Sequence, residues 1–108
     1  MRTTYEKLVR DGIPARLDLS AVRYAIRVAS PDEMSSLLHA KLDEEVAELR
    51  EAVSDTDVID EIADTLEVLL ALALQHGADE EMVRARQSAK RTDRGGFERG
   101  IVLRWTET

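Results

Sequence analysis

The sequence predicts an all-α protein, a helical bundle with an irregular N-terminal segment, and three observations support this fold class. Apolar side chains in the centre of the chain recur at spacings of three and four, as they do in amphipathic helices. Aromatic residues make up 4% of the chain and apolar residues 44%, which favours helices packed through Leu, Val, Ile and Ala. With 108 residues, the chain has the length of one domain, residues 1–108, with a small core.

The first thirty residues are expected to hold little regular structure. Asp11-Gly12 predicts a turn, and Pro14 suits the start of a short helical turn. From Val22 to Val28, apolar residues alternate with others that include two arginines. This period of two favours a short extended segment.

The first long helix is expected to begin after Ser30. Serine is a favoured N-cap, Pro31 fits the first helical position, and Glu33 completes a capping box. The apolar residues that follow form one stripe: Met34, Leu37, Leu38, Leu42, Val46, Leu49 and Val53.

The second long helix is expected from about Val58 to Gln75, after the capping turn "SDTD" and before Gly77. After Asp64 it is apolar around most of its circumference, more than one partner helix covers. This excess predicts a homo-oligomer, a dimer or higher, in which a second chain completes the bundle. A third helix follows Asp79 in "EEMVRARQSAK", and the apolar segment "IVLRW" closes the chain after a Gly-rich turn.

Charge is distributed unevenly along the chain, whose net charge is -7. Residues 30–83 hold two basic and sixteen acidic groups, whereas both flanks are positive. This pattern suits a metal site that receives a phosphorylated ligand, and it also suits a solvated surface. Nucleic acid is not expected as a partner, because the negative bulk field repels phosphate unless a metal ion neutralises it.

Several classes of protein are excluded by composition. Without cysteine there is no disulfide, zinc-thiolate site or thiol nucleophile. The N-terminal "MRTTYEKLVRDG" lacks an apolar signal core, and the apolar run from Val68 to Leu74 is too short to span a bilayer. We therefore expect no membrane partner and a cytoplasmic location.

Two carboxylates of the second long helix point into its apolar stripe. Glu61 and Asp64 share a helical face with Val68 and Leu72. A carboxylate withdrawn from water costs several kcal/mol unless a partner compensates it. A cationic partner is therefore expected at this face.

The first long helix supplies a matching pair of carboxylates. Glu45 and Glu48 flank its apolar stripe together with Lys41, whereas Glu44 and Glu51 are expected to point toward solvent. An antiparallel hairpin brings the flanking pair opposite the inward carboxylates of the second helix.

Four clustered carboxylates repel one another unless they bind protons or a cation. Oxygen donors favour Mg²⁺, with Mn²⁺ as a substitute, over zinc or copper. A di-iron site needs Glu-x-x-His, and neither His39 nor His76 has a glutamate three residues before it. Spacing alone leaves a second interpretation open, because a highly acidic hairpin can carry the same pattern as solvated surface.

The acidic residues resemble a known motif. Glu44-Glu45-x-x-Glu48 followed by Glu61-x-x-Asp64 is similar to the signature of the MazG-like, all-α nucleoside triphosphate pyrophosphohydrolase superfamily. The segments "YEKLVRDGIP", "KLDEEVAEL", "DEIADTLEVLLAL" and "RGGFERGIVL" resemble its small single-domain branch of phosphoribosyl-ATP pyrophosphohydrolase-like, or house-cleaning, enzymes. The resemblance covers most of the chain and departs at Gly12, where the branch commonly has lysine.

The resemblance implies a role for each of several residues. It implies that Mg²⁺ is ligated by Glu45, Glu48, Glu61 and Asp64. The residues implied to meet phosphates are Lys41, Lys90 and Arg94, and those implied to act in catalysis are Glu44, Glu45 and Lys41, of which Glu44 belongs to the motif without clearly facing the metal. The N-terminal motif contributes Lys7, Arg10 and Asp11, for which we infer a substrate-closing role.

The resemblance implies hydrolysis of a nucleoside triphosphate to a nucleoside monophosphate and pyrophosphate. We expect the substrate to be a non-canonical nucleotide. Two alternatives remain. One is hydrolysis of phosphoribosyl-ATP in histidine biosynthesis, which uses the same metal chemistry. The other is a non-catalytic helical module that binds nucleotides or regulates a partner.

Overall fold

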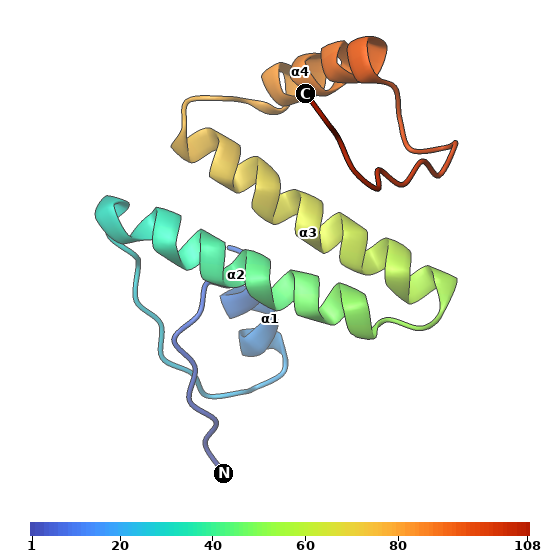
Figure 1. Ribbon diagram of the computed structural model, residues 1–108. Helices are drawn as coiled ribbons and strands as arrows, with labels where there is room; N and C mark the ends of the chain where they lie inside the picture. The colour runs from blue at the N-terminus through green and yellow to red at the C-terminus, as the bar shows by residue number, and fades with distance from the viewer.

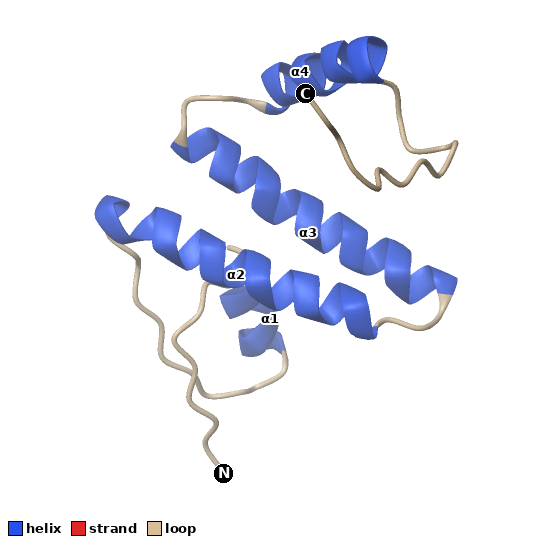
Figure 2. Cartoon of the chain, in the orientation of Figure 1, coloured by secondary structure: helices blue, strands red, loops and turns tan.

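The computed structural model describes residues 1–108 and contains helices but no strand (Figure 2). The helices are α1, Ile13–Leu19; α2, Pro31–Glu51; α3, Asp55–Gln75; and α4, Glu80–Arg94. The predicted all-α fold class is confirmed. None of the four helices combines the length and the apolar character that crossing a membrane requires.

Local capping sets the ends of the three longer helices. At the start of α2, the backbone N–H of Ser30 donates to Glu33 Oε1 at 3.1 Å, which is one half of the predicted capping box. Ser54 Oγ accepts from the backbone N–H three residues further on at 3.1 Å, so α3 begins three residues before the expected Val58. Asp79 caps α4 in the same way, at 2.9 Å.

The antiparallel hairpin of α2 and α3 is the centre of the molecule (Figure 1). The turn at residues 52–54 reverses the chain between them, and Gly77, with φ of 78°, follows the end of α3. α4 packs against α3 and not against α2, and α1 packs against none of the other helices. Residues 22–28, expected to be extended, are exposed and form no strand, because an isolated segment has no neighbouring strand with which to pair.

The interior of a single chain is thin. Three residues are buried: Leu38 and Glu45 of α2 and Val68 of α3. Apolar residues stay exposed on the outer side of α3, among them Ile59 and Leu74 at 65% and 66% of their accessible surface. The excess apolar surface expected of the second long helix is therefore present in the structure.

The hairpin core can be tested with two matched valines. Val68 is 7% exposed and Val53, in the turn, is 92% exposed. We expect Val68→Ala to lower the free energy of unfolding by about 2 kcal/mol through lost apolar burial. Val53→Ala should change it by less than about 0.5 kcal/mol. Urea unfolding followed by circular dichroism measures both, and equal effects would show that the hairpin interface is not the core.

Candidate metal centre

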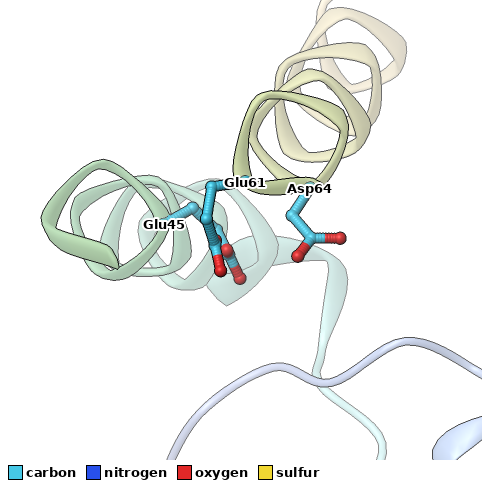
Figure 3. Close-up of side chains that lie close together, drawn as sticks. All are labelled: Glu45, Glu61 and Asp64. Atoms are coloured by element: carbon cyan, nitrogen blue, oxygen red, sulfur yellow. The ribbon is translucent and has the colours of Figure 1, made fainter. Parts of the chain in front are cut away.

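Three carboxylates from two helices meet on one side of the hairpin (Figure 3). Glu45 comes from α2, and Glu61 and Asp64 come from α3. Each offers one oxygen, and these three oxygens all lie within 4.8 Å of one another. The i, i+3 spacing on α3 and the antiparallel pairing of the helices produce this arrangement. The sequence predicted a fourth member, Glu48, which is not one of these three.

Two oxygens of this cluster lack a partner. Oε2 of Glu45 and Oε2 of Glu61 are buried, and neither accepts a hydrogen bond. Glu45 is also 6% exposed as a residue, so water cannot solvate it freely. A buried carboxylate oxygen without a donor is costly, and such an atom marks a place where an ion, a proton or a ligand is expected.

The cluster also shifts the protonation of its members. Burial raises the pKa of Glu61 above its ordinary 4.5, and the charges of Glu48, Asp64 and Glu45 raise it further. The pKa of Glu48 is raised for the same reasons, burial first and then the charge of Glu45. Glu48 is exposed and lies outside the group of three, at its edge, where it adds negative charge.

The N-terminal segment places two cations beside the cluster. Lys7 Nζ donates to Glu44 Oε1 at 2.9 Å, and Arg10 Nη2 donates to Asp64 Oδ1 at 2.8 Å. The ion pair with Lys7 holds the pKa of the Glu44 carboxyl below its usual value. Arg10 and Lys7 are thus brought to the carboxylates, as a role in ligand binding requires.

One orientation expected from the helical pattern is wrong. Glu44 was expected to point toward solvent, but its side chain is 28% exposed and is paired with both Lys7 and Lys41. A single helix offers no sign of this contact, because the covering residue comes from 37 positions earlier in the chain. Glu51 is exposed, as expected.

Lys41 of α2 is paired with two glutamates of the same helix. Its Nζ is 3.3 Å from Glu45 Oε1 and 3.4 Å from Glu44 Oε2, and the side chain is 17% exposed. A cation held between two carboxylates offsets part of their repulsion in a place where solvent screens it little. Its position at the cluster agrees with the role that the sequence resemblance implies.

The remaining predicted site residues are exposed and form no ion pair with Glu45, Glu61 or Asp64. Asp11 is exposed in the turn before α1. Lys90 and Arg94 are exposed on α4, which packs against α3 only, and neither forms an ion pair with a cluster carboxylate. Arg94 Nε instead lies 3.8 Å from Oδ2 of its neighbour Asp93.

The donor set fits a hard divalent cation. Three carboxylates within 4.8 Å of one another supply only oxygen, and two of their buried oxygens are free to coordinate. Oxygen-only sets of this kind favour Mg²⁺ or Mn²⁺. The cluster can therefore hold such an ion, with Glu48 close enough to contribute charge.

Comparison with known proteins supplies an independent observation. Residues 21–90, more than half of the chain, match the family model described as phosphoribosyl-ATP pyrophosphohydrolase, PRA-PH. A protein of Mycolicibacterium smegmatis, described as uncharacterized, is 54% identical over 46 residues, which are 43% of this chain and 47% of that protein. The match thus spans about half the length of that relative. No solved structure matches the chain.

The raised pKa of Glu61 predicts how stability depends on pH without metal. Above that raised pKa, Glu61 is ionised, and its charge costs more free energy in the folded chain than in the unfolded chain. Ionised Glu61 therefore destabilises the fold. This cost disappears as the pH falls through the raised pKa toward 4.5. In EDTA we therefore expect Glu61→Gln to melt at a higher temperature than wild type at pH 8, and the difference to shrink by pH 5.

Thermal unfolding at both pH values measures this difference. Glu67→Gln is the control, because Glu67 is an exposed carboxylate on the same helix. A Glu61→Gln variant that is less stable than wild type at pH 8 would contradict the prediction.

Proposed function

Because the chain belongs to the phosphoribosyl-ATP pyrophosphohydrolase family, a MazG-like all-α family, we propose that it hydrolyses a non-canonical nucleoside triphosphate with Mg²⁺, giving a monophosphate and pyrophosphate. One observation carries the proposal. The buried oxygens of Glu45 and Glu61 lack partners beside Asp64, and a pyrophosphohydrolase needs cations at such a place to receive a triphosphate.

Glu45, Glu61 and Asp64, with Glu48 at the edge, are the residues proposed to hold the ion. When bound, Mg²⁺ neutralises phosphate charge and lowers the pKa of a coordinated water. The family match covers all four of these residues.

The surrounding residues supply the other roles. Glu45, whose second oxygen has no donor, is proposed to accept the proton of the attacking water. Glu44 holds Lys7 and Lys41 close to the cluster, where their ammonium groups can meet the charge of the departing pyrophosphate. Arg10 adds a guanidinium, whose geometry suits bidentate phosphate binding. Asp11, in the adjoining turn, is proposed to take part in closure over the substrate.

We propose that Lys90 and Arg94 meet substrate phosphates, as the sequence resemblance implies. Both lie on α4, which packs against α3, the helix that carries Glu61 and Asp64. Arg94 lies beyond the residues that the family match covers.

Phosphoribosyl-ATP is the second candidate substrate, because the matching family carries its name. It presents the same triphosphate to the same carboxylates, and no residue of the cluster recognises a particular base.

We also propose that the protein works as a homo-oligomer. One chain exposes 9857 Å², where a compact monomer of 12.1 kDa exposes about 6,000 Å². The Cα radius of gyration is 18.2 Å, against about 13 Å for a compact chain of this length. The excess area is larger than one protomer's share of an obligate dimer interface, about 1,000–2,500 Å².

The proposed oligomer can be tested by measuring the molar mass of the protein in solution. The apolar C-terminal segment is among the surfaces left uncovered, with Leu103 at 77% and Val102 at 81% exposed. Multi-angle light scattering is expected to give at least twice 12.1 kDa. Leu103→Asp should shift the mass toward the monomer if this segment lies in the interface. A monomeric wild type at micromolar concentration would contradict the proposal.

The activity can be tested by pyrophosphate release. The panel contains canonical, oxidised, deaminated and methylated nucleoside triphosphates together with phosphoribosyl-ATP, each with Mg²⁺ and with EDTA. We expect release from at least one of them, abolished by EDTA, and a fall in kcat/KM of about 100-fold or more in Glu61→Gln.

Glu67→Gln is the matched control on the same helix and should keep wild-type activity, because that carboxylate is exposed and unpaired with the cluster. No release from any substrate, with the fold intact by circular dichroism, would favour a non-catalytic binding module.

A further inference from the structure

The N-terminal segment contacts the hairpin through two ion pairs, one with each helix. Lys7 is paired with Glu44 of α2, and Arg10, three residues later, is paired with Asp64 of α3. The segment therefore crosses the carboxylate side of both helices, the side toward which the cluster points in Figure 3.

The two ion pairs use different carboxylates. Glu44 is not one of the three residues whose oxygens converge, so Lys7 leaves the donor set free. Asp64 is one of the three, so Arg10 already holds a carboxylate that the candidate metal centre needs. Of the two cations in this segment, only Arg10 competes for the site itself.

We propose that Arg10 is a positioning residue that stands in for the cation at Asp64 and gives up this ion pair when the site takes up a divalent metal. The inference rests on the proposed metal centre. A guanidinium and a divalent cation on one carboxylate repel each other, so each weakens the other's hold on Asp64. This coupling is reciprocal: metal binding weakens the ion pair between Arg10 and Asp64, and that ion pair lowers the affinity for the metal by the same factor.

The exchange is confined to a side chain. The carbonyl oxygen of Arg10 accepts from the backbone N–H of Ile13 at 3.0 Å, which fixes the backbone to the start of α1. Lys7 keeps the other end of the segment on Glu44. The Arg10 side chain is 55% exposed, so its guanidinium can leave Asp64 without disturbing the interior. Once released, it lies beside the cluster, free to bind a phosphate.

Binding of Mn²⁺ alone to the full-length protein tests the competition, followed by electron paramagnetic resonance of the free ion. Arg10→Gln should tighten the Kd for Mn²⁺ about two- to fivefold, the change that loss of one exposed competing ion pair allows. Lys7→Gln is the matched control, with the same charge change in the same segment but a partner outside the donor set. It should tighten the Kd by a smaller factor.

A second measurement follows the wild-type side chain directly. The Nε–Hε signal of Arg10 in ¹⁵N NMR spectra, assigned by its absence in Arg10→Gln, should move when Mg²⁺ is added. The same signal should stay in place when Mg²⁺ is added to Glu61→Gln at a concentration that saturates wild type.

The outcomes separate this inference from the proposed function. If wild type binds Mn²⁺ and Glu61→Gln does not, the metal centre stands, and weaker or unchanged binding in Arg10→Gln with a static Arg10 signal overturns the exchange. If wild type binds no Mn²⁺, the metal centre and the exchange both fail. Tighter binding in Arg10→Gln than in Lys7→Gln, with a moving signal, supports the exchange.

Discussion

Mutual repulsion among carboxylates at the interface of α2 and α3 is the constraint on which the rest of this structure depends. Glu45, Glu61 and Asp64 converge where apolar side chains would pack at less cost, and burial of Glu45 keeps water from screening its charge freely. The chain offsets this with cations from two places. Lys41 comes from the same helix as Glu45, and Lys7 and Arg10 come from the N-terminal segment.

These cations compensate only part of the negative charge of the carboxylates. The pKa of Glu61 and that of Glu48 are raised, and two buried oxygens have no donor, so the internal cations leave negative charge unbalanced. A structural ion-pair network would be expected to satisfy these atoms. Unsatisfied carboxylates in a chain of the phosphoribosyl-ATP pyrophosphohydrolase family are what a site for a metal ion and a polyphosphate requires.

The thin core has a similar origin. A hairpin that uses part of its inner face for charge has less surface for apolar packing, and Leu38 and Val68 are the only apolar residues that are buried. The outer side of α3 and the C-terminal segment hold the apolar residues that a single chain leaves uncovered. In the proposed homo-oligomer, a second copy would supply the apolar burial that the carboxylate side cannot.

The sequence by itself determined the helices and the helical faces. Apolar spacing, the caps at Ser54 and Asp79 and the i, i+3 carboxylates of α3 act within a few residues, so their consequences can be derived from neighbours along the chain. Only the tertiary structure decided which cation meets which carboxylate. Lys7 and Glu44 are 37 positions apart, and Arg10 and Asp64 are 54. A basic segment and an acidic hairpin attract each other in many registers, and packing of the folded chain selects one of them.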